Sequence, residues 1–377
     1  MKILHITQSA GYGVTIYVES LIKGLRTPAT KQIILGSEYY DTDHFRALAD
    51  EVVCIPMDRN ISLRDVATIA KCIKIVRKIN PDIVYCHSAK AGIYGRIACM
   101  GLKAKVVYNP HGWSFNMRRG ALATFVYKFI EYVFAFATDR IVLISQFELD
   151  STPKCFPQHK LVKICNGIDI DKDTDLLNNH AIGRSDLQIA GDAFVVGIVG
   201  RISIQKGQDK FVEVAKKIKK EIPSAQFIIV GGKSDDVPIE EIIRKHGLED
   251  CFTITGEVKD AIRYVPMFDV ALFTSRWEGF GLVLPEYMLA KRPVVAFAID
   301  AAKEIIKDRY NGICVAANDV DAMAKAVVEL SKNSDLSNKI VANAYQDALK
   351  KYDIKRVAEE HRDLFNSLNI RRGGDKS

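Results

Sequence analysis

Residues 275–286 read SRWEGFGLVLPE and follow a short apolar run at residues 270–273, with Thr274 between them. The run predicts a buried β-strand, and open α/β sheets bind ligands beyond the carboxyl ends of their strands. Gly279 and Gly281 allow the backbone of the following loop to approach a ligand closely, and Pro285 suits the first turn of a helix. Free backbone N–H groups at such a helix start, together with the helix dipole, favour an anion. The stretch therefore predicts an α/β fold with an anion site at a strand end.

Two glutamates in this stretch, Glu278 and Glu286, stand eight residues apart. The first lies in the predicted loop and the second in the first turn of the predicted helix. One can therefore reach a sugar while the other reaches the hydroxyl groups of a ribose. Either glutamate alone would be an ordinary surface residue. Their spacing, the glycines between them and the preceding strand together favour a shared binding role.

A second stretch, residues 200–207, reads GRISIQKG and lies between a predicted strand at 194–199 and a predicted helix at 208–221. Arg201 offers a forked guanidinium and Lys206 a compact point charge, a pair that suits the oxygens of a diphosphate. In a transferase both charges would stabilise a departing nucleotide diphosphate, which a metal ion does in other enzymes. The alternative is that both are solvated loop cations.

Short β-branched apolar runs alternate with amphipathic helical stretches along the chain, which is typical of βαβ units and parallel sheets. They predict thirteen strands, at 2–7, 32–35, 52–55, 83–86, 105–108, 140–144, 162–165, 194–199, 226–230, 252–255, 270–273, 294–296 and 312–315. So many parallel strands exceed one sheet of ordinary size, so two doubly wound sheets are expected.

The 377 residues also have the length of two domains. The polar stretch 169–192 has little apolar periodicity and is the predicted linker. We expect a first domain at residues 1–175 and a second at 176–353. Apolar residues at helical spacing predict a closing helix at 354–368, and 371–377 is expected to be a frayed tail.

The net charge is +7, of which +6 falls in residues 1–175. This asymmetry favours an anionic partner on the first domain, such as a diphosphate or a membrane surface. No long basic run or recognised binding signature accompanies the charge, so no nucleic-acid partner is expected.

The cysteines and the apolar segments bear on the compartment. Eight scattered cysteines form no CxxC pair, so they are expected to be free thiols in a reducing compartment. The N-terminus lacks the features of a signal peptide, and the apolar segment 125–138 is interrupted by Lys128 and Glu131. The protein is therefore expected to be cytoplasmic.

The Arg201–Lys206 pair and the Glu-x7-Glu motif resemble the two most specific marks of glycosyltransferase family 4, in the expected order. That family is retaining and has the GT-B architecture, an α/β fold in which two Rossmann-like doubly wound domains face a central cleft. The resemblance extends over essentially the whole chain. It includes Gly-Tyr-Gly at 11–13, Pro-His-Gly at 110–112 and Asn-Gly-Ile-Asp at 166–169.

The resemblance implies a function for each domain. The N-terminal domain, 1–175, is expected to lie on the acceptor side, and the closing helix, about 354–377, to pack back on it. The C-terminal domain, 176–353, is expected to bind the nucleotide sugar. Tyr12 separates two glycines that the family commonly has side by side, which leaves open which backbone amides reach the phosphates.

The resemblance also implies roles for single residues. Arg201 and Lys206 would hold the diphosphate, and Glu286 would hydrogen-bond the ribose. Glu278 and His111 would meet the donor sugar. These residues, without Glu286, are the expected catalytic set. The other expected donor-binding residues are Gly11, Gly13, Gly200, Gly231, Gly232, Val258, Phe280, Gly281 and Leu282.

Residues 87–96 and 110–115 resemble a bacterial subset of the family that builds capsule, exopolysaccharide or O-antigen repeat units. His87, Lys90 and Arg96 are therefore expected on the acceptor side. The expected partners are a UDP-sugar donor and a saccharide or polyprenyl-diphosphate-linked acceptor. No DxD-like pair accompanies a plausible metal site, so no metal and no other cofactor is expected.

Two other functions remain as alternatives. A sugar-nucleotide 2-epimerase shares the GT-B architecture, but it would lack the glutamate motif beside the Arg-x4-Lys turn and would isomerise the free donor. A non-enzymatic two-lobed sugar-binding protein would normally be exported.

An interfacial membrane helix is a further hypothesis. Residues 118–136 combine two arginines and Lys128 with a dense set of aromatic residues, and the helix expected at 63–80 adds Lys71, Lys74, Arg77 and Lys78. One interpretation is peripheral contact with the anionic inner face of the cell membrane. The other interpretation is a helix of the protein core with one solvent-exposed side.

Overall fold

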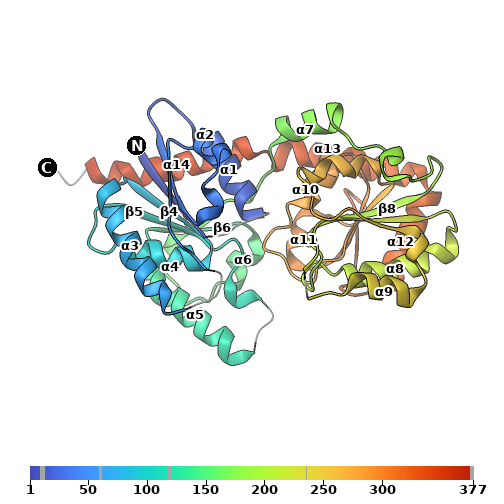
Figure 1. The fold of residues 1–377 in the computed structure, drawn as a ribbon, viewed down its shortest axis with the longest axis horizontal. Coiled ribbons are helices and arrows are strands. Elements are labelled where there is room, and N and C mark those ends of the chain that lie inside the picture. The colour runs from blue at the N-terminus through green and yellow to red at the C-terminus, as the bar shows by residue number, and fades with distance from the viewer. Residues whose placement is uncertain (9–12, 59–61, 118–119, 235, 374–377) are drawn as a thin grey trace. The chain divides into compact units, whose positions relative to one another are not determined.

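The computed structural model of the protein describes residues 1–8, 13–58, 62–117, 120–234 and 236–373. The chain divides into two compact units. Unit 1 consists of Met1–Asn166 with Ile354–Ser377, and unit 2 of Gly167–Asp353. Each unit is an open, parallel, doubly wound sheet with its own hydrophobic core, which is the Rossmann-like architecture expected for each half of a GT-B fold (Figure 1).

Unit 1 contains a seven-stranded sheet in the order β3-β2-β1-β4-β5-β6-β7. Its strands are β1 (Lys2–Thr7), β2 (Lys31–Gly36), β3 (Glu51–Cys54), β4 (Ile83–His87), β5 (Lys105–Asn109), β6 (Arg140–Leu143) and β7 (Leu161–Lys163). Its helices are α1 (Gly13–Leu25), α2 (Asp43–Leu48), α3 (Arg64–Ile79), α4 (Ala89–Ala98), α5 (Ala121–Phe136), α6 (Gln146–Ser151) and α14 (Ile354–Gly373).

Helices cover both faces of this sheet, which is why central strands such as β4 are buried along their whole length. One core joins the sheet to α1, α2 and α14, and the other joins it to α3, α4 and α5. The C-terminal helix α14 lies along α1 (Figure 1). A Cβ at Gly24 would come within 2.5 Å of the Cβ of Ala358, so glycine allows this close approach.

Unit 2 contains a six-stranded sheet in the order β10-β9-β8-β11-β12-β13. Its strands are β8 (Val195–Val199), β9 (Gln226–Val230), β10 (Phe252–Ile254), β11 (Val270–Phe273), β12 (Val294–Phe297) and β13 (Ile313–Val315). Its helices are α7 (Ile170–Asn179), α8 (Gln208–Glu221), α9 (Ile239–His246), α10 (Val283–Leu289), α11 (Asp300–Ile305), α12 (Val320–Lys332) and α13 (Ser334–Lys351). Helices α8, α9 and α12 pack against one face through a shared apolar cluster.

The strand predictions are confirmed, because all thirteen strands are present with ends shifted by at most two residues. The predicted linker at 169–192 is wrong in its local structure, since it contains α7. Polar residues build this helix: the Asp169 side chain caps its first turn by accepting from the Lys172 backbone N–H. None of the helices in the described ranges combines the length and low polarity needed to cross a membrane.

Candidate functional site in unit 2

The order of strands in unit 2 creates a switch point between β8 and β11. These strands are neighbours in the sheet, but the chain continues from β8 to β9 on one side and from β11 to β12 on the other. The loops that leave their carboxyl ends therefore diverge, and doubly wound folds bind ligands at such a switch point. Residues 200–207 follow β8 and residues 274–282 follow β11, so both predicted motifs lie at this point.

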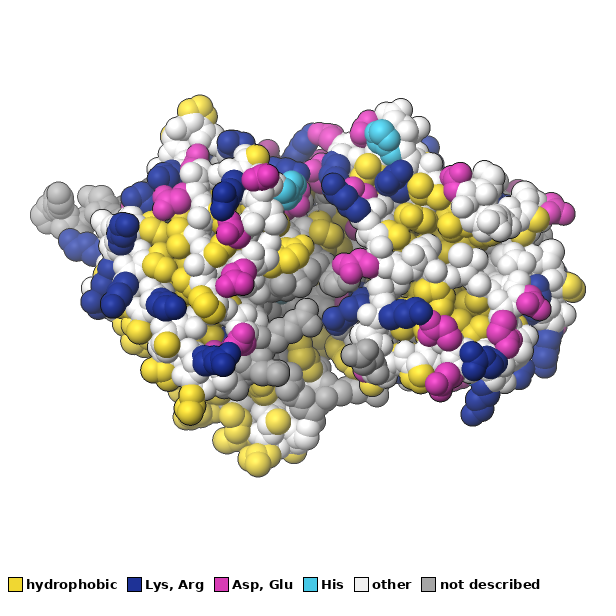
Figure 2. Space-filling view, viewed as in Figure 1, with side chains coloured by type: hydrophobic (Ala, Val, Ile, Leu, Met, Phe, Trp, Pro, Cys, Tyr) yellow, Lys and Arg dark blue, Asp and Glu magenta, His cyan; other side chains and the backbone are white. Residues whose placement is uncertain are grey.

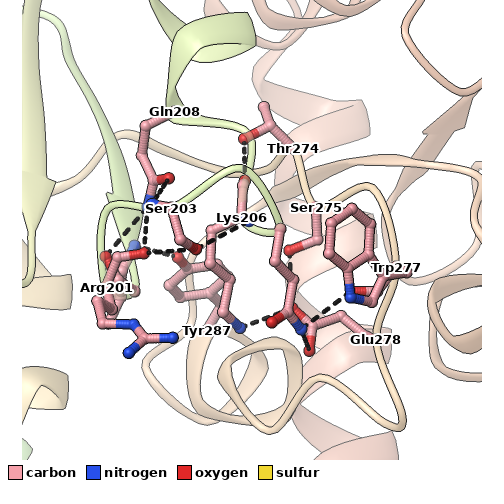
Figure 3. A network of polar contacts seen from close by, with 12 residues as sticks. Arg201, Ser203, Lys206, Gln208, Thr274, Ser275, Trp277, Glu278 and Tyr287 are labelled. Atoms are coloured by element: carbon pink, nitrogen blue, oxygen red, sulfur yellow. Dashed lines mark hydrogen bonds and ion pairs between the residues drawn. The ribbon is translucent and has the colours of Figure 1, made fainter. Parts of the chain in front are cut away.

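A direct ion pair joins the two motifs. Lys206 Nζ lies 2.6 Å from Glu278 Oε1 (Figure 3). Ser275 Oγ donates to the same oxygen at 2.8 Å, and Gln205 Nε2 donates to Glu278 Oε2 at 3.3 Å. The Glu278 side chain is only 9% exposed, whereas that of Lys206 is 26% exposed. The carboxylate is thus held by three donors, and the ammonium remains accessible to an anion.

The loop that carries Lys206 is fixed by backbone contacts. Thr274 Oγ1 donates to the Lys206 carbonyl at 2.9 Å. Gln208 Nε2 donates to the carbonyls of Gly200 and Arg201, each at 3.1 Å. Gly207 has φ +69°, and a Cβ there would lie 2.3 Å from the Thr274 carbonyl oxygen, so only glycine permits this turn. Figure 3 shows the Arg201 and Lys206 side chains extending from the same side of the loop.

Glu286 lies in the first turn of α10, near Lys206. Burial and the nearby carboxylate of Asp173 raise the pKa of Glu286 to about 8, while Lys206 and Lys172 oppose that rise. Burial likewise raises the pKa of Asp173 to about 7. The next residue of α10, Tyr287, accepts a hydrogen bond from the Val199 N–H at 2.7 Å, which ties α10 to the end of β8. Lys206, Glu278 and Glu286 are thus brought together within unit 2.

Other predicted donor-binding residues of unit 2 lie at neighbouring strand ends. Gly231 and Gly232 follow β9, and a Cβ at Gly231 would lie 2.3 Å from the Gly200 carbonyl oxygen. Val258 lies half-buried in the loop after β10. Phe280 is buried, with its ring centroid 5.9 Å from that of Tyr352. Gly281 has φ +88°, and Leu282 is the residue before α10. Their contacts with a donor stay predictions.

The predicted residues of unit 1 occupy different environments. His111 follows β5 with φ +52°, and its Nε2 lies 3.1 Å from His87 Nδ1. His87 is fully buried, so its side chain contributes to the core of unit 1. Lys90 pairs with Asp65 at 2.9 Å. Gly13 is the first residue of α1, whereas Gly11 lies outside the described residues.

Arg96 has a structural position that the sequence did not reveal. It is 1% exposed, and its two terminal guanidinium nitrogens both donate to Glu131 Oε2 at 3.0 Å. Tyr108 donates to the other oxygen of Glu131 at 2.8 Å. This buried, fully paired carboxylate joins α4 and β5 to α5. Arg96 therefore holds the fold together through its guanidinium, and an acceptor contact by this side chain stays only a prediction.

Within the ranges that the structure describes, no three His, Cys, Asp or Glu side chains gather in the way that a metal site requires. The groups available to stabilise a polyanion in unit 2 are cationic side chains and backbone amides. Two Rossmann-like units, one of which carries this cationic site at its strand ends, are the features expected of a GT-B glycosyltransferase.

Comparisons with known proteins agree. The model of Glycosyltransferase Family 4 matches residues 12–172, and that of Glycosyl transferases group 1 matches residues 181–347. The chain belongs to glycosyltransferase family 4. One similar protein is the Escherichia coli UDP-Gal:alpha-D-GlcNAc-diphosphoundecaprenol alpha-1,3-galactosyltransferase, 27% identical over 89% of this chain and 87% of the relative.

Two further proteins are similar to the chain. The capsular polysaccharide biosynthesis glycosyltransferase CapM of Staphylococcus aureus is 24% identical over 83% of this chain and 84% of its own. The solved structure of Anabaena HepE in complex with UDP and glucose shares the fold, with a TM-score of 0.82 over 97% of this chain and all of that chain at 22% identity. The predicted GT-B fold and glycosyltransferase activity are confirmed.

Sequence reasoning missed the residues that orient the site. Ser275 and Gln205, which hold Glu278, lie inside the two quoted motifs, but their partners depend on how two distant loops meet. Asp173 lies in a stretch that was assigned to a linker. The capping residue Asp169 and the acidic first turn of α7 are the signals that could have identified this helix.

Proposed function

We propose that the enzyme is a retaining, metal-independent transferase that moves a hexose or N-acetylhexosamine from a UDP-sugar to a saccharide or lipid-linked saccharide in bacterial surface polysaccharide assembly. Two similar proteins support this choice: one uses UDP-Gal and a diphosphoundecaprenol-linked acceptor, and another acts in capsular polysaccharide biosynthesis. HepE was solved with UDP and glucose bound.

The ion pair between Lys206 and Glu278 is the observation that carries the proposal. The partly exposed ammonium lies at the β8–β11 switch point, where a nucleotide diphosphate would bind, and Arg201 extends from the same loop. As the bond between the anomeric carbon and the β-phosphate oxygen breaks, negative charge develops on the leaving diphosphate. Cations already in position stabilise that charge without a reorganisation of the site.

The proposed transfer is a front-face displacement. The acceptor oxygen forms its bond to the anomeric carbon on the face from which the diphosphate leaves, and its proton passes to a phosphate oxygen. The configuration at the anomeric carbon is thereby retained. Glu278 and Glu286 act as binding and electrostatic groups in this scheme, with Glu286 on the ribose and Glu278 and His111 on the sugar.

The test is a screen of nucleotide sugars by thermal shift and by hydrolysis, with and without EDTA. We expect a UDP-sugar to stabilise the protein and to be turned over equally well with the chelator present, whereas GDP-sugars have no effect. Conversion of the donor to its 2-epimer without any acceptor would instead establish the epimerase alternative. Binding without any turnover of donor, with acceptor saccharides present, would favour a non-enzymatic sugar-binding protein.

We further propose that α5 brings unit 1 to the surface of an anionic membrane, where a lipid-linked acceptor is found. Glu131 faces the core on one side of this helix, and a stripe of large apolar side chains is exposed on the other (Figure 2). Phe125 is 67% exposed and Phe129 is 58% exposed. The full stripe consists of Leu122, Phe125, Val126, Phe129, Val133 and Phe136.

The charge around this stripe suits an anionic lipid surface. Lys128 is exposed on α5 between the apolar residues, and exposed lysines and arginines line α3 on the same face of the sheet. An interfacial helix combines these features, with an apolar side in the headgroup region and cations near lipid phosphates. The basic excess of the first half of the chain acts in the same direction.

Co-sedimentation with vesicles tests the membrane contact. Phe125→Ser combined with Phe129→Ser should reduce binding to anionic vesicles about tenfold or more, because each buried aromatic side chain contributes roughly 1.5–3 kcal/mol. Tyr310→Ser, which removes an exposed aromatic from unit 2, is the control and should bind as the wild type does. Equal sedimentation of wild type and double variant, or no preference for anionic lipid, would contradict the proposal.

A further inference from the structure

Four side chains form a continuous line of hydrogen-bonding groups through the core of unit 1. Gln32 Oε1 lies 3.2 Å from His5 Nε2, and His5 Nδ1 lies 3.3 Å from His87 Nε2. His87 Nδ1 in turn lies 3.1 Å from His111 Nε2. The first three residues stand on the adjacent strands β2, β1 and β4, and His111 follows β5, so the line crosses the sheet from strand to strand.

The direction of the hydrogen bonds is set at the far end of this line. Gln32 Nε2 donates to the carbonyl oxygen of Ile22 at 2.7 Å. The reverse amide orientation would bring two carbonyl oxygens together, so Gln32 Oε1 must point to His5 and act as an acceptor. His5 Nε2 therefore carries the proton that is donated to Gln32.

Each histidine of the line is neutral near pH 7. Burial lowers the pKa of His5 to about 4 and that of His111 to about 3, and it lowers the pKa of His87 well below its usual range. A neutral imidazole has one N–H donor and one acceptor nitrogen. The proton on His5 Nε2 leaves Nδ1 as an acceptor, so His87 must donate from Nε2, and His111 must donate from Nε2 to His87 Nδ1.

The remaining nitrogen of His111, Nδ1, thus has a lone pair and no proton. Among the described residues, none forms a hydrogen bond with this atom. The ring is held from two sides: the His111 N–H donates to Asn109 Oδ1 at 2.8 Å, and Tyr17 packs edge-on with ring centroids 4.8 Å apart. His111 is partly exposed, whereas the other three members of the line are buried.

We propose that Gln32, His5 and His87 are positioning residues that fix His111 as the Nε2–H tautomer, so that Nδ1 accepts a hydrogen bond from a hydroxyl group of the transferred sugar. The part about the sugar rests on the proposed function, whereas the tautomer rests on unit 1 alone. A sugar hydroxyl can donate to Nδ1 only while this nitrogen is unprotonated. The opposite tautomer would present a donor and would not accept this proton.

The experiment uses a matched pair of variants at the centre of the line. Asparagine and leucine have similar size, but the Oδ1 of His87→Asn can replace Nδ1 as the acceptor for His111, whereas His87→Leu offers none. Both variants lose the bond to His5 equally. Gln32→Met is a second, remote perturbation that removes the acceptor setting the direction of the whole line.

The first measurement is the ¹⁵N spectrum of the histidine rings, with His111 assigned by its loss in His111→Gln. We expect an unprotonated Nδ1 in the wild type and in His87→Asn, and a substantial Nδ1–H population in His87→Leu and Gln32→Met. The second measurement is donor turnover. We expect kcat/KM to fall about tenfold in His87→Leu and Gln32→Met, the worth of one hydrogen bond, with His87→Asn close to wild type.

These outcomes separate the two proposals. A protonated Nδ1 in the wild type, or equal turnover by His87→Leu and His87→Asn, would overturn the positioning role. Absence of turnover of any nucleotide sugar by the wild type would instead defeat the proposed function, because the tautomer is read from the spectrum without a substrate. UDP affinity should not change in any of the variants, since the proposed nucleotide contacts lie in unit 2.

Discussion

Replacement of Lys206 by alanine is the perturbation that best isolates the proposed chemistry. The variant removes the ammonium that lies 2.6 Å from Glu278 Oε1. The Glu278 carboxylate keeps two hydrogen-bond donors in this variant, because Ser275 still donates at 2.8 Å and Gln205 at 3.3 Å. The substitution should therefore lower the free energy of unfolding by about 1 kcal/mol or less, as for other partly exposed ion pairs.

The cost to catalysis should be larger. A unit charge about 4 Å from the leaving phosphate contributes roughly 4 kcal/mol where the effective dielectric constant is about 20. The loss of one donor from an oxyanion site has a similar size, about 10²–10³ in kcat. We therefore expect Lys206→Ala to lower kcat by about 10²–10³. KM for the donor should change less, because the charge on the diphosphate grows as the bond breaks.

Steady-state release of UDP measures this effect, with a thermal melt of each variant to monitor folding. Lys217→Ala is the matched control: this lysine also forms an ion pair, 2.6 Å from Asp321, but it lies away from the β8–β11 switch point. The control should keep wild-type kcat. A Lys206→Ala enzyme that transfers sugar at a near wild-type rate would refute the assignment of the diphosphate site.

Further predictions follow from buried titratable groups. The folded protein raises the pKa of Glu286 to about 8, so it favours the neutral acid and loses stability as pH rises from the unfolded value, near 4.5, through 8. Glu286→Gln should therefore raise Tm at pH 8.5 but not at pH 4.5, and should abolish the Tm increase caused by UDP; a lower Tm at pH 8.5 would contradict this. The effect of pH on stability has the opposite sign for His361, because burial lowers the pKa of this residue from 6.5 to about 4, as it does for His5. Between pH 6.5 and 4 the unfolded chain binds protons that the folded one does not, so each imidazole should reduce the free energy of unfolding by about 3 kcal/mol over this window. Urea titrations should show that His361→Gln has a shallower loss than the wild type, and parallel curves would refute the buried neutral state.

The fold was predictable because each strand has a recognisable signal in its own short stretch of sequence. Strands such as β4 and β11 are covered on both faces, so they read as short apolar runs between turn residues and amphipathic helices. The end of α3 is also local, since Asn80 adopts φ +47° directly before Pro81. Helix α7 was missed because its side chains are mostly polar and none of them is fully buried, so no periodic apolar signal marks it.

The site was predictable only in part. The loops after β8 and β11 carry their chemistry in contiguous motifs, so Lys206 and Glu278 could be named before their contact was known. The line from Gln32 to His111 could not be found in this way, because its members are spread along the sequence from His5 to His111 and meet only through the strand order. Arg96 illustrates the opposite case: a charged residue in a suggestive stretch is paired with Glu131 inside the core.

A crystal structure with bound UDP would test the central claim most directly, namely that the ends of β8 and β11 hold a nucleotide diphosphate. The phosphate oxygens should lie about 3 Å from Arg201 and Lys206, and the ribose hydroxyls within hydrogen-bond distance of Glu286. Density for UDP elsewhere, with the Lys206–Glu278 pair untouched and no nucleotide at the switch point, would contradict it.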